Sequence, residues 1–206
     1  MTDALLAPLA AALDGTGELV AAVSGEQWDL PTPCADWTVR QLVDHLVGGN
    51  RMSTRVLRGQ PLPPLDELGR RSHDDQLGND PARAYRTSAD ELLEAIRAPG
   101  VLERTHTFPV GTLPGPAVVH LRTVETLVHG WDLARATSRT VPFPDDLAEQ
   151  ELTFSRDLLG RLPEGRHPFA PSRPVADDAP AIDRLAALLG RYPEQMWSGQ
   201  AAADGR

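Results

Sequence analysis

Residues 123–137 read TVETLVHGWDLARAT, and their spacing predicts a helix whose buried face is bordered by polar side chains. With Leu121 placed at 0° and an advance of about 100° per residue, the apolar residues lie within roughly 60° of one another; these are Leu121, Val124 and Val128. Three polar residues fall at roughly 40°, 20° and 80° on the same wheel, in the order Glu125, Asp132 and His129. These polar side chains therefore lean toward the core instead of opposing it.

A carboxylate or imidazole that leans toward a core needs a partner, because burying it unpaired costs several kcal/mol. Glu125 and His129 lie one helical turn apart, so they could bond to each other or share a metal ion inside a bundle. His45 favours the metal, because it lies in the middle of another amphipathic stretch. Two histidines and a glutamate from two helices are the ligands of catalytic zinc sites, and equally of two-histidine-one-carboxylate iron sites.

Apolar periodicity along the rest of the chain predicts further helices and no internal repeat. The helices are expected over residues 3–23, 38–57, 81–98, 116–137, 145–161 and 180–189. The connections are expected to be a long crossing loop over 59–81, an irregular stretch over 101–115 with an extended piece at 105–110, and a proline-rich wrap over 163–179. The fold class is therefore all-α.

Helix-boundary signals support these assignments. Thr38 followed by Gln41 is a capping box at the start of the second helix. Asp80 before a proline is a good N-cap for the third. Asp178 is expected to cap the last helix, and Gly190 to close it.

The whole is predicted to be an all-α bundle with one long crossover loop and a small C-terminal extension. A chain of 206 residues with 41% hydrophobic residues can bury a sizeable core. The expected division is a metal-binding bundle over residues 1–140 and a helical extension over 141–206 that packs on the bundle.

Composition excludes several classes of function. The net charge of -9, without a basic cluster, argues against nucleic-acid binding. All 20 basic residues are arginine, which excludes a catalytic Schiff-base lysine, a lysine-anchored pyridoxal phosphate and a P-loop lysine. With no apolar run of about 18 residues and no signal peptide at the start, we expect a cytoplasmic protein without a membrane partner. A single cysteine allows no internal disulfide, as in a reducing compartment.

Two stretches carry a family resemblance, PTPCADWTVRQLVDHLVGGN (31–50) and TVETLVHGWDLARAT (123–137). They resemble the DinB-like superfamily, and within it the N-terminal branch of the mycothiol-dependent maleylpyruvate isomerases. The tail FAPSRPVADDAPAIDRLAALLGRYP (169–193) resembles short actinobacterial members known as metal-binding proteins. The resemblance covers nearly the whole chain.

The resemblance implies a four-helix bundle in which three side chains bind a divalent metal, often zinc. At the matching positions these are His45, Glu125 and His129. Zinc is therefore expected, with nickel or iron as alternatives. The isomerase resembled here has a separate C-terminal domain that helps to form its thiol and substrate site. This chain has too few residues after the bundle for a full domain of that kind.

The resulting hypothesis is a metal-dependent enzyme, a thiol-dependent transferase or isomerase, that acts on a small electrophilic substrate with mycothiol as co-substrate. The alternative is a metal-binding protein without thiol chemistry, either a Lewis-acid enzyme or a non-catalytic binding module. Asp132 is assigned as the catalytic residue, with an orienting hydrogen bond as the other reading. Asn50 and Arg51, one turn beyond His45, are assigned to cofactor binding at the pocket mouth.

The remaining singled-out residues are expected to be structural. Cys34, alone in a proline-rich loop, is expected to pack as a small side chain and not to act as a nucleophile. Trp37 and Trp131 are expected in the core or in a pocket wall. The other histidines are expected at surface or structural positions, namely His73, His106, His120 and His167. A homodimer is compatible with the sequence.

Overall fold

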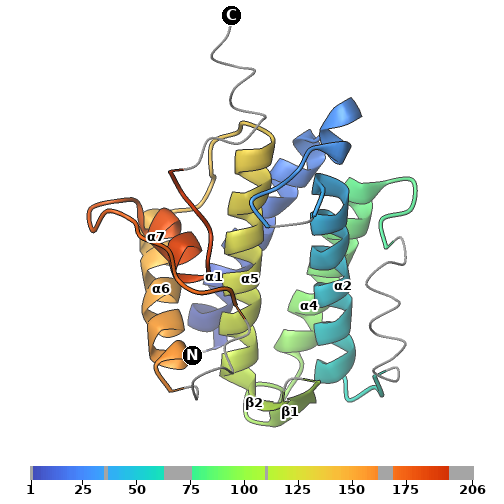
Figure 1. The fold of residues 1–206 in the computed structure, drawn as a ribbon. Helices are drawn as coiled ribbons and strands as arrows, with labels where there is room; N and C mark the ends of the chain where they lie inside the picture. The colour runs from blue at the N-terminus through green and yellow to red at the C-terminus, as the bar shows by residue number, and fades with distance from the viewer. Residues whose placement is uncertain (1, 35–36, 63–75, 110, 162–168, 195–206) are drawn as a thin grey trace, which may run out of the picture.

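The computed structural model describes residues 2–34, 37–62, 76–109, 111–161 and 169–194, and most of these residues are helical (Figure 1). The elements run along the chain as α1 (Thr2–Ala22), the 3-10 helix η1 (Gly25–Asp29), α2 (Val39–Leu57), α4 (Pro81–Arg97), β1 (Thr105–Phe108), β2 (Gly111–Pro114), α5 (Gly115–Ala136), α6 (Asp145–Leu159) and α7 (Ala181–Leu188). The predicted all-α fold is confirmed. The centre of the expected crossing loop, residues 63–75, lies outside the described residues.

Four of the helices, α1, α2, α4 and α5, form a bundle (Figure 1). α1 packs against α4 and α5, and α2 packs against the same two helices. α1 and α2 therefore lie diagonally across the bundle, although they follow each other along the chain. As a consequence α2 and α5, which are distant in sequence, become neighbours.

The start of α2 follows the predicted capping box. The Thr38 hydroxyl accepts a hydrogen bond from the Gln41 backbone N–H at 3.3 Å, and the Gln41 side chain accepts one from the Thr38 N–H at 2.9 Å. Both bonds satisfy N–H groups that have no partner within the helix, so they fix where α2 begins. The apolar face that follows is buried and comprises Val39, Leu42, Val43, Leu46 and Val47.

A buried polar chain ties α2 to its neighbours. A Cβ at Gly49 would lie 2.7 Å from Nη1 of Arg122, so the glycine leaves room for that guanidinium. Arg122 donates to Oδ1 of Asn50 at 2.9 Å, and the Asn50 amide donates to the Ser88 hydroxyl of α4 at 3.1 Å. The network sets the spacing of α2 and α5, the two helices that carry the candidate metal ligands.

The C-terminal helices α6 and α7 pack on each other and against α5 (Figure 1). The start of α7 differs from the prediction that Asp178 caps it, because the N-cap residue is Pro180. The N–H of Ala181 instead donates to Oδ1 of Asp145 at 2.8 Å. The prediction was wrong because the acceptor at the start of α7 is a carboxylate from α6, which is distant in sequence.

The expected extended piece at residues 105–110 is one strand of a hairpin. β1 and β2 pair antiparallel, with Thr105 opposite Pro114 and Phe108 opposite Gly111. The second strand was not predicted, because its sequence GTLP lacks the alternating β-branched residues that indicate a strand.

α1 is long and apolar enough to cross a membrane by length and composition alone. The stretch Asp3–Ala22 has a mean hydropathy of 1.3, and half of it is buried inside the protein. Its buried side chains include Leu9 and Val20, which belong to the bundle core. A core helix passes the same test, so this finding is weak evidence against the expected absence of a transmembrane helix.

Candidate metal centre

Three side chains that can hold a metal ion meet between α2 and α5, with their ligand atoms within 4.8 Å of one another. Oε2 of Glu125 lies 3.4 Å from Nε2 of His45 and 3.5 Å from Nε2 of His129. The fold therefore brings together the three residues that the sequence predicted as ligands. Both imidazoles approach the same carboxylate oxygen through the same ring nitrogen.

The spacing of these donors suits a metal ion better than it suits direct hydrogen bonds. Charge-assisted N–H···O bonds are about 2.7–2.9 Å long, and both contacts to Glu125 exceed that length. Ligands about 2.0–2.1 Å from a tetrahedral zinc ion lie about 3.3–3.4 Å from one another. Two imidazole nitrogens and one carboxylate oxygen are also the donors of catalytic zinc sites that keep a position open. The residues present therefore fit a divalent metal.

Trp37 forms an apolar wall beside the two histidines. Its ring centre lies 4.6 Å from that of His45 and 5.8 Å from that of His129. The two imidazoles are 5.1 Å apart in an edge-on arrangement. The indole therefore packs against both imidazoles and gives this side of the site an apolar surface.

Polar and charged neighbours within the cluster outweigh burial for two of the three ligands. Burial acts to raise the pKa of Glu125, but the close imidazoles of His129 and His45 hold that pKa well below its usual value. Burial acts to lower the pKa of His129, yet its hydrogen bond to Asp132 and the close carboxylate of Glu125 raise it. For the half-exposed His45, burial prevails and lowers the pKa. The Glu125 carboxylate is therefore ionised, which is the form that binds a cation.

Asp132 lies behind His129 and is fully buried. Its Oδ2 accepts a hydrogen bond from Nδ1 of His129 at 3.0 Å and another from Nη2 of Arg191 at 2.9 Å. Nε of Arg191 donates to Oδ1 at 3.3 Å, so the guanidinium grips both oxygens. This arrangement fixes the imidazole with Nδ1 as the donor and Nε2 directed at Glu125.

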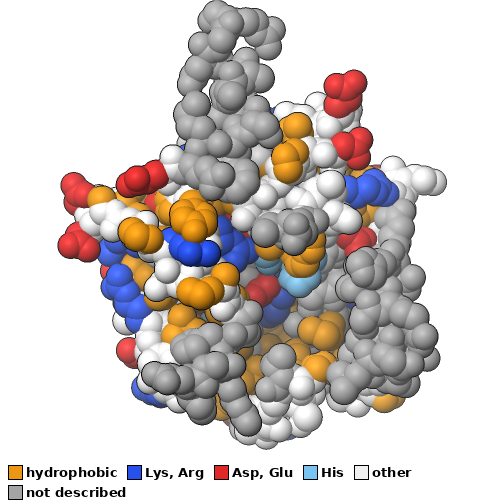
Figure 2. Space-filling model, viewed as in Figure 1, with side chains coloured by type: hydrophobic (Ala, Val, Ile, Leu, Met, Phe, Trp, Pro, Cys, Tyr) orange, Lys and Arg blue, Asp and Glu red, His pale blue; other side chains and the backbone are white. Residues whose placement is uncertain are grey.

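The candidate ligands lie in a cavity of about 740 Å³. Part of its lining comes from residues 31–34 and Trp37, and another part from the segments 169–173 and 189–192 after the bundle. Figure 2 shows histidine, acidic and basic side chains gathered in a hollow on this face, with hydrophobic side chains around them. The volume is within the range of small-molecule sites.

Asn50 and Arg51 do not line this cavity, contrary to their assignment at its mouth. Asn50 is fully buried in the polar chain that links α2, α4 and α5. Arg51 donates to the backbone oxygen and to the side chain of Gln76, at 3.1 Å and 2.8 Å. The side chains one helical turn beyond His45 therefore point into the bundle or toward a neighbouring loop, away from the candidate ligands.

The other described histidines make structural contacts. His106 is buried, with Nε2 2.8 Å from the backbone oxygen of Val101. His120 contacts Glu151 of α6 at 2.9 Å and stacks on Phe154. These two therefore fit the expected structural role, whereas His73 and His167 lie outside the described residues.

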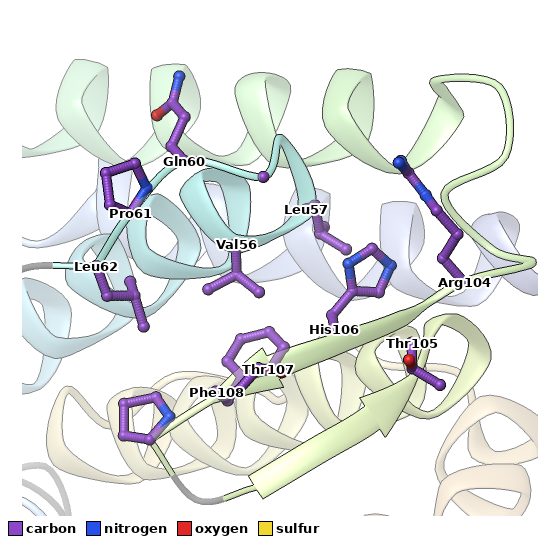
Figure 3. Close-up of a pocket in the computed structure, with 12 residues that line it drawn as sticks. Val56, Leu57, Gln60, Pro61, Leu62, Arg104, Thr105, His106, Thr107 and Phe108 are labelled. Carbon is purple, nitrogen blue, oxygen red and sulfur yellow. The ribbon is translucent and has the colours of Figure 1, made fainter.

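A second cavity, of about 600 Å³, lies between the end of α2 and strand β1 (Figure 3). Val56, Leu57 and Phe108 provide much of its lining, and His106 points into the same region. No group of metal-ligating side chains was found there among the described residues. Among the described residues, the groups of metal-ligating side chains therefore lie at the other cavity, of about 740 Å³.

The outer wall of that cavity was not predicted. Phe169, Arg173, Arg191 and Tyr192 lie in a tail that the sequence linked to the family resemblance but to no role. No motif marks these residues, because an arginine gains its role here only when the chain folds back over α5. In the sequence, only the family resemblance of residues 169–193 connected this region with the site.

Comparisons with known proteins found a matching family and similar sequences. A family described as mycothiol maleylpyruvate isomerase N-terminal domain matches residues 9–134. The uncharacterized proteins Rv0738 and MT0763, from two strains of Mycobacterium tuberculosis, are each 35% identical to this chain over 181 residues. Each match covers 87% of this chain and 93% of the relative.

Solved structures share the fold. A crystal structure of a mycothiol-dependent maleylpyruvate isomerase is similar with a TM-score of 0.57 at 15% identity, and that of a histidine-to-alanine mutant with a TM-score of 0.59 at 14% identity. Each similarity covers 74% of this chain and 70% of the other. At such low identity the likeness concerns the fold alone.

Proposed function

Since the chain belongs to the mycothiol maleylpyruvate isomerase N-terminal domain family, we propose that it is a metal-dependent enzyme that uses a low-molecular-weight thiol to isomerise or conjugate a small electrophilic substrate. By likeness to the solved relatives, which are mycothiol-dependent isomerases, the thiol is mycothiol. The family match supports the thiol-dependent chemistry, and the donor set on the cavity floor supports the metal.

The convergence of His45, Glu125 and His129 in a cavity is the observation that carries this proposal. A divalent cation held by these residues would supply Lewis acidity, which favours the ionised form of a thiol that reaches it. Zinc is the metal proposed, with nickel or iron as alternatives suited to the same ligands. The cavity volume of about 740 Å³ is within the range of sites that bind small molecules.

The residues of the chain have separate tasks in this proposal. The three candidate ligands hold the cation, and Trp37 limits water around them. Asp132, first assigned as the catalytic group, is fully buried behind His129 and lies 3.0 Å from its Nδ1. We therefore propose Asp132 as a positioning residue that orients His129, which was the other reading of the sequence.

The remaining proposals concern the chain as a whole. We propose a metal-binding bundle over residues 1–140 and a helical extension over 141–206 that packs on it, as the contacts of α6 and α7 with α5 suggest. We propose a cytoplasmic protein with small-molecule partners and no nucleic acid, consistent with a net charge of -9. A homodimer is compatible with this proposal.

Thiol binding provides the decisive test. Mycothiol should bind the zinc-loaded protein and release about one proton near neutral pH, because a metal ligand must be deprotonated. Calorimetry in two buffers of different ionisation enthalpy measures that proton. The metal-free protein serves as the control, since thiol contacts with the cavity walls alone release no proton.

Failure of this experiment would have a clear meaning. If neither mycothiol nor simpler thiols bind the metal-loaded protein, the thiol-dependent function is wrong. A metal-binding protein without thiol chemistry, either a Lewis-acid enzyme or a non-catalytic binding module, would then take its place.

Replacement of Cys34 tests whether the protein supplies its own thiol. Cys34 lines the cavity, and its sulfur lies within 4.8 Å of ligand atoms of His129 and Asp132. We expect Cys34→Ser to retain full metal content and at least about half of the mycothiol affinity, because the external thiol is the proposed nucleophile. Elemental analysis and the same calorimetry measure both quantities. Loss of turnover with metal and mycothiol still bound would make Cys34 the reacting thiol.

A further inference from the structure

The outer wall of the metal cavity is built by two short segments beyond the part of the chain that matches the family. We call residues 169–173 and 189–192 together the roof. The backbone N–H of Arg173 donates to the backbone oxygen of Ala187 in α7 at 2.8 Å. Gly190 has a φ of +91°, and a Cβ there would lie 2.5 Å from the Cβ of Ala170. The two segments are therefore held tightly together, and the roof is a preformed surface.

Two arginines of the roof line the cavity, and they differ in their partners. Arg191 is neutralised, because both carboxylate oxygens of Asp132 accept its hydrogen bonds. Arg173 has no ion pair among the described residues, and its Nε is buried without a hydrogen-bond acceptor. Because no carboxylate of the described residues neutralises Arg173, its positive charge is available to an anionic ligand in the cavity.

The guanidinium of Arg173 is held in place by an aromatic ring. Its Cζ lies 4.4 Å from the ring centre of Tyr192. Tyr192 is 46% exposed, and among the described residues no other large hydrophobic side chain is exposed. An exposed tyrosine at a cavity mouth provides a ligand with an apolar surface, and the stacking presents the flat guanidinium in one orientation.

We propose that Arg173 and Tyr192 form a carboxylate-binding subsite that selects anionic substrates for the metal centre. This inference rests on the proposed function. A planar guanidinium pairs with a carboxylate through two parallel hydrogen bonds, and a neutral isostere loses both. The chain as a whole carries a net charge of -9, so an unpaired cation on the cavity wall directs an anionic ligand to this place. Substrate selection thus comes from the C-terminal extension, while the metal ligands come from the bundle.

Binding of maleate and of its uncharged dimethyl ester by the zinc-loaded protein, without thiol, tests the subsite. Trp37 lines the cavity, so quenching of tryptophan fluorescence can report binding, and calorimetry confirms it. Arg173→Gln should weaken maleate binding at least about tenfold and leave the affinity for the ester unchanged. Arg173→Lys, which keeps the charge but loses the fork, should give an intermediate affinity.

Arg86→Gln is the matched control, because Arg86 is exposed on α4, outside the cavity, and its removal changes the net charge equally. All variants are compared at equal zinc content, after their midpoints of thermal unfolding have been shown to match that of wild type. The subsite is refuted if wild type binds no maleate, if Arg173→Gln leaves maleate affinity unchanged, or if Arg86→Gln weakens it as much. Because mycothiol binding is measured separately, loss of the subsite would leave the thiol-dependent function standing, and the reverse also holds.

Discussion

Protein with His129→Ala, purified without a chelator, is expected to contain less than about a tenth of the divalent metal found in wild type. The substitution removes one of three candidate ligands, whose Nε2 lies 3.5 Å from Oε2 of Glu125. The two ligands that remain, His45 and Glu125, offer too few donors to retain a metal through purification. Elemental analysis of the purified proteins gives the metal-to-protein ratio directly.

The control for this prediction is His106→Ala, because His106 is a buried histidine outside the cavity. It should retain the wild-type metal content. Circular dichroism of His129→Ala, and of wild type after chelation, should keep the helical signal, because the bundle has an apolar core of its own. Equal metal content in wild type and His129→Ala would contradict the assignment of the metal site. A random-coil spectrum after chelation would mean that the metal is needed for folding.

The candidate ligands on α5 could be predicted because their relation is local. Glu125 and His129 are four residues apart, so helical geometry alone places them on one side of the helix. The inclusion of His45 needed more, because spacing along one helix cannot show which other helix lies beside it. The structure brings α2 next to α5 through the ring-like packing of the bundle, and Gly49 leaves the space for that approach.

The surroundings of the site escaped prediction because they depend on contacts between distant segments. Arg191 and Asp132 are 59 residues apart, and their pairing exists only when the tail returns over α5. Asn50 and Arg51 were assigned to the pocket from their distance to His45 along α2, but a helical turn also changes the direction of a side chain. Tertiary packing therefore decided these positions, whereas helix boundaries such as the capping box at Thr38 followed from local sequence.

Asp132→Ala is expected to weaken zinc binding about 10- to 100-fold and to lower the free energy of unfolding by about 3 kcal/mol or more. Zinc affinity falls because Nδ1 of His129 loses the acceptor that fixes the ring. Stability falls because the largely buried guanidinium of Arg191 loses the carboxylate that accepts two of its hydrogen bonds. Competition with a zinc chelator gives the affinity, and urea denaturation gives the stability.

Two further variants separate positioning from stability and from acid–base catalysis. In the double variant Asp132→Ala with Arg191→Met, no unpaired charge remains buried, so stability should recover in part while zinc affinity stays low. Asp132→Asn keeps an oxygen that can accept from Nδ1 of His129, so it should bind zinc within about tenfold of wild type and retain measurable thiol-dependent turnover. A positioning residue tolerates that exchange, whereas a general base does not, because an amide cannot take up the proton. Normal zinc affinity in Asp132→Asn together with a complete loss of turnover would therefore return Asp132 to the catalytic role first assigned to it.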